Sequence, residues 1–334
     1  MPIDVHAHYV PPRILEALHD KGASFGVTVL PHKPGNCLSF EYGVTLRPLL
    51  PRLLEDESAR IDSFMAGGVD RQILSVWSDL FAYGLTPVKG EAWHRLMNDT
   101  MAEVCVRHPA HFSFLATGPL QDPARAAREL ERAQRECNAV GATVAANVMG
   151  ANLGEAPLDE YWAAASELGL PVLIHPNQPD PTPRVRRWAL NQTVHFPYDT
   201  TLSVASLIFG GVMDRFPNLK LILPHGGGLI PYLIGRLDHM HARMDRTAEG
   251  DVALDRPSAY LDRFHYDTIL HHPRVLLFLI DSVGLERIVL GSDDPFPPGV
   301  REPVRILHEA GLVAAQIATV TDDNPRKLFK LPQS

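Results

Sequence analysis

Two histidines one residue apart, His6 and His8, close the first apolar run of the chain, in the sequence IDVHAHY. In a β-strand the side chains of residues i and i+2 leave the same face, so both imidazoles would point the same way from the strand end. Two converging imidazoles suit a divalent metal ion such as zinc. Because the chain contains 16 histidines, a pair of solvated or core histidines would explain this motif equally well.

Three later segments also place a polar residue where an apolar run ends. His175 ends LPVLIH, His225 ends LKLILPH, and Asp293 follows ERIVLGS. Taken singly, these residues are a core histidine, a turn residue before three glycines, and a helix N-cap. Taken together, they follow four separate strand ends in the order HxH, H, H, D. Placing such groups at the ends of apolar strands costs free energy unless a partner satisfies them, and one metal ion satisfies them all.

The elements that must position these residues are short apolar runs that alternate with helical patterns. Strands separated by helices favour parallel βαβ units, and eight repeats predict an α/β fold, the (β/α)8 TIM barrel, whose strand carboxyl ends share the face of the active site. A doubly wound open sheet is the rival, but no Gly-rich phosphate loop follows the first strand. The predicted strands are Ile3–Ala7, Gln72–Val76, Phe112–Ala116, Thr143–Val148, Pro171–His175, Lys220–Pro224, Arg263–Asp267 and Arg287–Leu290. The predicted helices are 57–67, 92–108, 123–139, 158–168, 201–216, 230–243, 273–283 and 300–310.

Two stretches fall outside this repeat. Residues 10–50 are rich in Gly and Pro, and two short β-like pieces within them predict an insertion after the first strand, in the form of a small hairpin lid. Residues 176–198 predict a long loop after the fifth strand, of the kind that is usually functional or disordered. We therefore expect residues 1–334 to form one metal-dependent TIM-barrel domain with an insertion at about 10–50.

The composition excludes several classes of partner. The 31 basic and 39 acidic residues give a net charge of −8 without a basic stripe, which argues against a nucleic-acid partner. The three cysteines show neither CxxC spacing nor a disulfide framework, so we expect a reducing cytoplasm. No apolar run is long enough to span a bilayer, and no signal peptide precedes the first strand, so we expect no membrane association.

The ordered motifs IDVHAH, IHP, PHGGG and GSDDPFP resemble those of the amidohydrolase superfamily and, within it, of the aminocarboxymuconate semialdehyde decarboxylase group. The likeness continues through RIDSFMAGGVD, RVRRW and FGGVMDRFPNLKLILPHGGG, so it covers nearly the whole chain. A set of this length and order is specific for the group, but it does not specify one substrate.

The resemblance implies roles for the residues at the strand ends. His6, His8, His175 and Asp293 match the metal ligands of the group. Zinc is its usual metal, and manganese or cobalt also suits three histidines and an aspartate. An open coordination position would hold a water whose pKa the metal lowers toward neutrality. His225 matches the non-ligand histidine that moves a proton to or from this water, and we class Asp293 as catalytic as well as metal-binding.

The resemblance also implies a pocket for the substrate. Arg47, in TLRPLL, matches an arginine that holds the substrate carboxylate, for which its planar fork of donors is suited. Without the resemblance, Arg47 is a surface arginine in a Pro-rich loop. Trp188, in RRW, matches an aromatic residue that lines the pocket. Arg243 lies one position before Met244, which matches a second carboxylate-binding arginine contributed by a neighbouring subunit, so the likeness implies a homodimer.

The chain departs from the decarboxylase in segments that concern the substrate. It has HPNQPD after the fifth strand and AANVMG after the fourth, where the decarboxylase has other residues. Asp294 stands where the decarboxylase commonly has tyrosine, and it is a candidate to support Asp293 or His175 through a hydrogen bond.

These observations lead to three hypotheses about function. The first is a metal-dependent, non-oxidative decarboxylase of a small unsaturated or aromatic carboxylic acid. The second is a hydrolase that uses the same metal and base on a lactone, an amide or a carbon–carbon bond beside a carbonyl, since related sites host several reactions. The third is a non-catalytic metal-binding protein. Structural zinc sites are usually closed and rich in cysteine, which these ligands are not.

Overall fold

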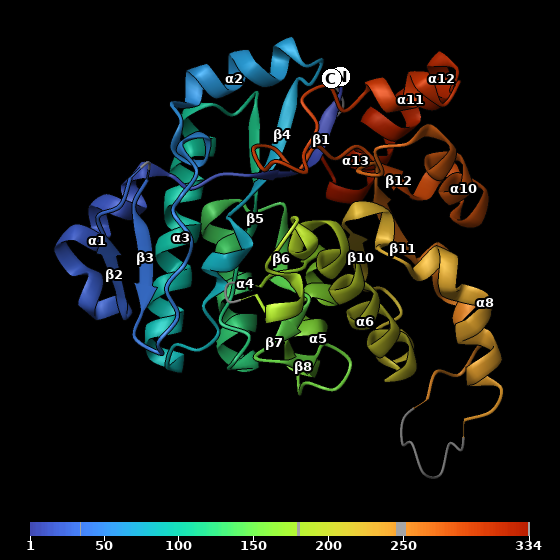
Figure 1. The fold of residues 1–334 in the computed structure, drawn as a ribbon, viewed down its shortest axis with the longest axis horizontal. Coiled ribbons are helices and arrows are strands. Elements are labelled where there is room, and N and C mark those ends of the chain that lie inside the picture. Colours follow the sequence, from blue (N-terminus) through green and yellow to red (C-terminus); the bar gives the residue numbers. More distant parts are fainter. Residues whose placement is uncertain (34, 179–180, 245–251, 333–334) are drawn as a thin grey trace.

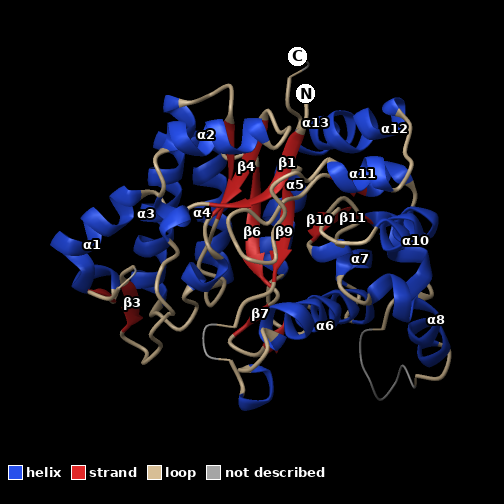
Figure 2. Cartoon of the chain, turned by 45° about the horizontal axis from the view of Figure 1, so that its top comes forward, coloured by secondary structure: helices blue, strands red, loops and turns tan. Residues whose placement is uncertain are grey.

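Eight parallel β-strands form the centre of the molecule, and helices surround them (Figures 1 and 2). The computed structural model describes residues 1–33, 35–178, 181–244 and 252–332. All eight predicted strands are present, in the sheet order in which they follow one another along the chain. They are β1 Ile3–His8, β4 Arg71–Ser75, β5 Phe112–Ala116, β6 Gly141–Ala145, β9 Pro171–His175, β10 Lys220–Leu223, β11 Phe264–Asp267 and β12 Ile288–Val289.

The first and last strands close the sheet into a ring. The backbone N–H of Val5 donates to the carbonyl of Leu290 at 2.9 Å, and the N–H of His8 donates to the carbonyl of Asp294 at 2.7 Å. These bonds join β1 to the segment that continues β12, next to a parallel bridge between Ala7 and Asp294. The closed ring confirms the predicted (β/α)8 barrel.

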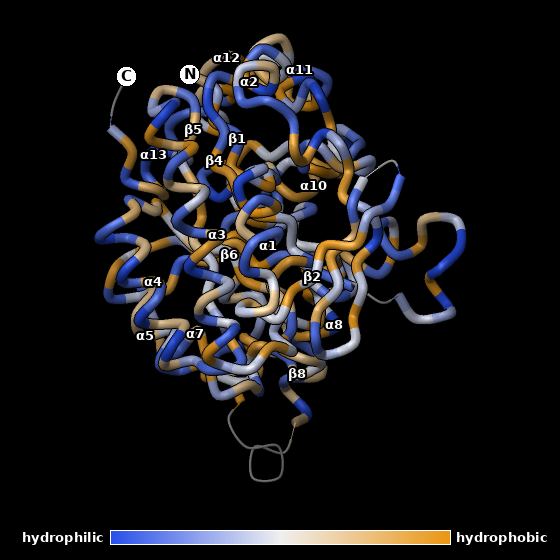
Figure 3. Tube along the Cα trace, turned by 90° about the vertical axis from the view of Figure 1, so that its left-hand side faces the viewer, coloured by the Kyte–Doolittle hydropathy of each residue, from blue (hydrophilic) through white to orange (hydrophobic). Residues whose placement is uncertain are grey.

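The hydrophobic core has two layers. One cluster fills the inside of the barrel, where side chains from alternating strand positions meet, and two residues of the last helix extend it. The other cluster lies between the strands and the surrounding helices. Figure 3 shows helices whose colour alternates between orange and blue along the chain, as expected for helices with one buried face. The inner cluster consists of Ile3, Val5, Ile73, Leu115, Leu173, Ile222, Val289, Leu328 and Phe329.

The helices cover the strands in the order that the alternating pattern predicts, with small shifts at their ends. Helix α6 begins at Phe196, five residues earlier than predicted, with Pro197 in its first turn. Only residues 305–309 of the predicted 300–310 helix are α-helical. The helices are α1 Pro12–Phe25, α2 Glu57–Ala66, α3 Pro87–Arg107, α4 Pro123–Cys137, α5 Asp159–Leu168, α6 Phe196–Phe209, α7 Val212–Arg215, α8 Ile230–His241, α10 Pro273–Val283, α11 Arg305–Glu309, α12 Ala314–Ala318 and α13 Asn324–Phe329.

The insertion after β1 contains the expected hairpin and a helix that the sequence analysis missed. Strands β2 (Val27–Leu30) and β3 (Cys37–Phe40) pair antiparallel, as predicted. They follow α1, which begins with a proline and ends at Gly26 with a φ of 70°. A second short hairpin, β7 (Asn147–Val148) with β8 (Ala151–Asn152), follows β6. Within the described residues, no helix has the length and apolar character that crossing a bilayer requires.

Candidate metal centre

The structure brings the five predicted polar residues together at the carboxyl ends of four strands. His6 and His8 end β1, His175 ends β9, His225 follows β10, and Asp293 follows β12. Ligating atoms of His6, His175, His225 and Asp293 all lie within 4.8 Å of one another. His8 joins them, because its Nε2 lies 3.1 Å from Nε2 of His6.

An irregularity in β1 turns these histidines toward the barrel axis. In a regular strand Val5 and His6 would face opposite sides, yet Val5 belongs to the inner core and His6 faces the metal cluster. The register explains this, since Asp4 pairs with Gln72 and Ala7 pairs with Leu74, so three steps on β1 oppose two on β4. Such a bulge re-aims a side chain, here the imidazole of His6.

Each histidine of β1 and β9 has an oxygen acceptor at Nδ1. His6 Nδ1 lies 2.7 Å from Oδ2 of Asp267, and His8 Nδ1 lies 3.2 Å from the carbonyl oxygen of Val76. His175 Nδ1 lies 2.7 Å from the carbonyl oxygen of the residue that follows it. A proton on Nδ1 donates to these acceptors, which leaves the Nε2 lone pairs free to bind a metal.

The remaining atoms of the cluster fit a divalent cation. His175 Nε2 and Asp293 Oδ1 are buried and have no hydrogen-bond partner among the described residues. Asp293 Oδ1 lies 3.2 Å from His8 Nε2 and 3.6 Å from His6 Nε2. Tetrahedral ligands about 2.0–2.1 Å from one ion are separated by about 3.3 Å, close to these distances. The donor set of imidazole and carboxylate is one that zinc and manganese accept.

Asp267 is a site residue that the sequence analysis did not single out. It is fully buried at the end of β11, where Oδ2 faces His6 and Oδ1 accepts from the N–H groups of Gly226 and Ile269 at 2.9 and 3.1 Å. Burial raises its pKa, but the hydrogen bond and charge of His6 outweigh burial, so the pKa of Asp267 lies below its usual value. Its sequence signal is weaker than that of His175, because Asp267 ends the mixed run RFHYD and not an apolar one.

His225 lies on the side of the cluster that solvent reaches. Its side chain is 12% exposed, compared with 0% for His6, and its Nε2 is 3.6 Å from Oδ2 of Asp293. Burial lowers the pKa of His225, but the interaction with the nearby carboxylate of Asp293 outweighs burial, so the pKa is raised. A histidine that holds a proton beside a ligand carboxylate can act in proton transfer.

Arg47 packs against two aromatic rings, one of which contacts a histidine of the metal cluster; its role in holding a carboxylate stays a prediction. Its guanidinium carbon is 5.1 Å from the ring centre of Trp77 and 5.5 Å from that of Phe296. The Phe296 ring in turn contacts the imidazole of His8, with ring centres 5.1 Å apart. Arg47 is exposed, so its donors are available to a ligand.

Two predicted substrate residues lie in other surroundings. Trp188 is 77% exposed, and Arg187 stacks on its ring at 4.8 Å. Arg243 is exposed just beyond α8, and its guanidinium donates to the carbonyl of His239 at 2.9 Å. The contacts described for these two side chains do not include the metal cluster, so their substrate roles stay predictions.

Asp294 supports neither Asp293 nor His175. Its two carboxylate oxygens form ion pairs with Arg52 at 2.9 Å and with the buried Arg60 at 3.2 Å. The carboxylate therefore links the last barrel strand to the segment before and within α2.

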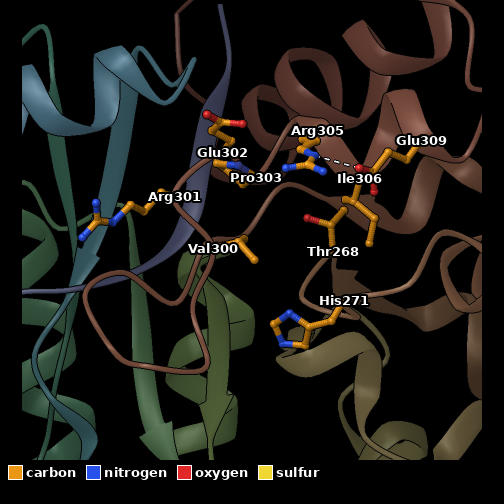
Figure 4. A pocket seen from close by; sticks show the side chains of 9 residues that line it. All are labelled: Thr268, His271, Val300, Arg301, Glu302, Pro303, Arg305, Ile306 and Glu309. Carbon is orange, nitrogen blue, oxygen red and sulfur yellow. Dashed lines mark hydrogen bonds and ion pairs between the residues drawn. The ribbon is translucent and has the colours of Figure 1, made fainter.

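A cavity of about 380 Å³ lies between the loop after β11 and the segment after β12 (Figure 4). Thr268 and His271 come from the first of these segments, and Val300 comes from the second. An ion pair between Arg305 and Glu309, 2.7 Å long, lies at its rim. The lining contains none of the metal-cluster residues, so this cavity is separate from the candidate metal centre.

Comparison with known proteins gives consistent results. The amidohydrolase family model matches residues 3–331. A 2-amino-3-carboxymuconate-6-semialdehyde decarboxylase of Dictyostelium discoideum is 34% identical over 76% of this chain and 70% of its own. A gamma-resorcylate decarboxylase of Rhizobium radiobacter is 28% identical over 90% of this chain and 95% of its own. The crystal structure of a dihydroxybenzoic acid decarboxylase from Polaromonas sp. JS666, with bound manganese and the inhibitor 2-nitroresorcinol, is 25% identical. It superposes with a TM-score of 0.79, and the match covers 100% of this chain and 98% of the other.

Proposed function

Because this chain belongs to the amidohydrolase family, we propose that it is a metal-dependent, non-oxidative decarboxylase of a small unsaturated or aromatic carboxylic acid. The observation that carries the proposal is the set of Nε2 and carboxylate atoms that converge at four strand ends with Arg47 beside them. The names of the relatives support it, since both curated relatives described above are decarboxylases.

His6, His8, His175 and Asp293 would hold the ion. We propose Zn²⁺ as the native metal, with Mn²⁺ or Co²⁺ as alternatives, because three histidines and one carboxylate suit each of them. Manganese is present in the Polaromonas relative. A bound divalent ion supplies a Lewis acid that polarises an oxygen of the substrate.

Arg47 and Phe296 would position the substrate. The guanidinium of Arg47 can donate two parallel hydrogen bonds to a carboxylate. The Phe296 ring lies between Arg47 and His8 and is partly exposed, so it offers a surface for a planar acid. In this arrangement the bond to the carboxyl carbon would lie between the arginine and the metal ligands.

His225 would supply the proton that completes the reaction. When the carbon–carbon bond to the carboxyl group breaks, CO₂ leaves and its bonding electron pair stays on the substrate carbon. A proton from His225 then forms the new C–H bond, and the histidine regains a proton from solvent, which its partial exposure permits. No oxidant or reductant is needed.

We propose further that the enzyme is a homodimer of the cytoplasm, in which Trp188 lines the pocket and Arg243 of one subunit binds the carboxylate in the other. The exposure of both side chains, and the position of Arg243 at the end of the outlying helix α8, support this assignment (Figure 1). Mixing two inactive variants, Arg243→Ala and Asp293→Ala, tests it. Mixed dimers would regain activity in one of their two sites, whereas a mixture that stays inactive would contradict a shared site.

The central experiment measures CO₂ release by metal-reconstituted protein over a panel of carboxylated muconate semialdehydes and hydroxybenzoates. We expect Asp293→Ala to lose both metal and turnover, and His225→Ala to keep the metal but lose at least about 100-fold in rate. Asp281→Ala, which changes an exposed aspartate of α10, serves as the control. Products that gain water without releasing CO₂ would indicate hydrolysis instead.

A further inference from the structure

One buried carboxylate close to the metal centre has no part in the function proposed above. Asp79 is 5% exposed and lies in the short 3₁₀ helix Ser78–Phe81 that follows β4. This helix is held firmly, because Trp93 Nε1 donates to the carbonyl of Leu80 at 2.7 Å and Ser78 Oγ donates to the carbonyl of Pro176 at 3.3 Å. The chain on either side of Asp79 is therefore held by α3 and by the segment after β9.

The two oxygens of Asp79 differ in their partners. The backbone N–H of Gln178, in the loop after β9, donates a hydrogen bond to the carboxylate. Oδ1, in contrast, is buried and has no hydrogen-bond partner among the residues that the structure describes. Buried acceptors nearly always have a donor, so an open one this close to a binding site indicates a ligand that brings the donor.

The charged neighbours of Asp79 are the residues assigned to substrate and metal. Its carboxylate interacts electrostatically with Arg47 and with His8. No ion pair within 4.0 Å joins Asp79 to Arg47, whose guanidinium instead stacks on Trp77 and Phe296. Arg47 is thus left to bind a substrate carboxylate, and Asp79 is left to bind another group of the same substrate.

We propose that Asp79 determines substrate choice by accepting, at Oδ1, a hydrogen bond from a hydroxyl or amino group of the acid that Arg47 holds. This inference rests on the proposed function for the identity of the pocket. Burial raises the pKa of Asp79, Arg47 and the N–H of Gln178 lower it, and the net pKa is about 6, so the carboxylate is an acceptor at neutral pH. The substrate class that follows is a planar unsaturated acid with a donor group, as opposed to an unsubstituted or alkylated one.

Asp79→Asn is the informative variant, because it reverses the hydrogen-bond preference at one atom. The N–H of Gln178 requires an oxygen acceptor, so the amide oxygen takes that side and the NH₂ group replaces Oδ1. The variant would then present a donor to the substrate. Asp70→Asn, at the opposite end of β4, is the matched control. Melting temperature and metal content show whether each variant keeps its fold and its centre.

The measurement is calorimetric binding of matched pairs, 2-, 3- and 4-hydroxybenzoate with the corresponding methoxybenzoates, to the metal-loaded protein. We expect the wild type and Asp70→Asn to bind at least one hydroxy acid tenfold or more tightly than its methoxy partner, and Asp79→Asn to abolish or reverse that preference. The proposal would be overturned if Asp79→Asn lost affinity equally for the hydroxy acid and its methoxy partner, or if the wild type did not prefer any hydroxy acid. If a hydroxy acid binds with this preference but releases no CO₂, the proposed decarboxylation is wrong, whereas the role of Asp79 in binding stands.

Discussion

At the scale of single residues, the metal centre depends on which ring nitrogen of each histidine carries the proton. Asp267 fixes this for His6, since its Oδ2 accepts from Nδ1 at 2.7 Å and leaves Nε2 to the metal. The same carboxylate also accepts from the N–H of Gly226, directly after His225. One buried aspartate therefore orients both a predicted ligand and the predicted proton carrier.

Asp267→Asn should weaken metal binding by about 10- to 100-fold, the usual effect of removing a partner of a ligand histidine. The amide oxygen would stay with the N–H groups of Gly226 and Ile269, so the NH₂ group would face His6 Nδ1 and favour the wrong tautomer. Competition with a chromogenic chelator measures the affinity. Asp262→Asn, an exposed aspartate before β11, should leave it unchanged, and equal affinity in both variants would remove Asp267 from the centre.

The raised pKa of Asp79 predicts a dependence of stability on pH. A carboxyl whose pKa is about 6 in the folded protein and 3.8 in the unfolded chain favours the fold only when protonated. The wild type should therefore lose up to about 3 kcal/mol relative to Asp79→Asn as the pH rises from about 4 to about 6, at about 1.36 kcal/mol per unit. Denaturant titrations across this range measure the difference. A constant difference would show that Asp79 ionises equally easily in both states.

Residue types at strand ends were enough to predict five members of the cluster, but not its supporting contacts. His175 and Asp293 were found because they follow apolar runs, whereas Asp267 ends the mixed run RFHYD, which gives no such signal. Asp79 gave no comparable signal, since a Trp-Ser-Asp segment after a strand is typical of an ordinary turn. Its proximity to Arg47 comes from the packing of the insertion against the barrel, which periodicity does not encode.

At the scale of elements, the loop after β10 determines where His225 lies. Gly226, Gly227 and Gly228 all have positive φ, of 63°, 81° and 62°. A Cβ on Gly228 would lie 2.3 Å from the carbonyl oxygen of Pro197 in α6, so this glycine permits a close approach of two backbones as well as a turn.

Gly228→Ala should therefore cost about 3 kcal/mol or more of unfolding free energy, and activity should fall as the loop shifts. Gly311→Ala separates the two causes, because Gly311 also has a positive φ, of 78°, but has nothing within 4 Å of its Cβ position. We expect that control to lose only about 1 kcal/mol. Denaturant unfolding measures both variants, and equal costs would mean that the contact with Pro197 is unimportant.

The elements most accurately predicted were those whose hydrophobic period is strong. Helix α10 has the predicted bounds Pro273–Val283, whereas α1 was missed because the glycines and prolines around it favoured a loop prediction. Pro12 in fact begins α1 and Gly26 ends it, so the residues that suggested irregular structure are the boundaries of a helix. The β1 bulge was equally hidden, because it depends on the register with β4.

At the scale of the whole molecule, the metal would connect three of the eight barrel strands, β1, β9 and β12. Removing it with a chelator should lower the melting temperature. At a free metal concentration 100-fold above Kd, binding contributes about 2.7 kcal/mol, which corresponds to about 4 °C for a chain of this size. Differential scanning calorimetry of the loaded and the stripped protein measures the shift. Asp293→Ala should show little of it, and an equal shift in that variant would place the metal elsewhere.

Because β1 pairs with the segment after β12, the metal centre can be completed only late in folding. Asp4 accepts a hydrogen bond from Ser292 Oγ at 2.6 Å, although the two residues are 288 positions apart in the sequence. The ring of strands therefore cannot close until the segment around Ser292 has been synthesised. Contacts of such long range form late and slowly. A chain whose synthesis stops before Asp293 contains every ligand histidine but not the carboxylate that completes the set. Retention of metal would thus distinguish finished barrels from interrupted or partly folded chains, and the appearance of bound metal would time the last step of folding.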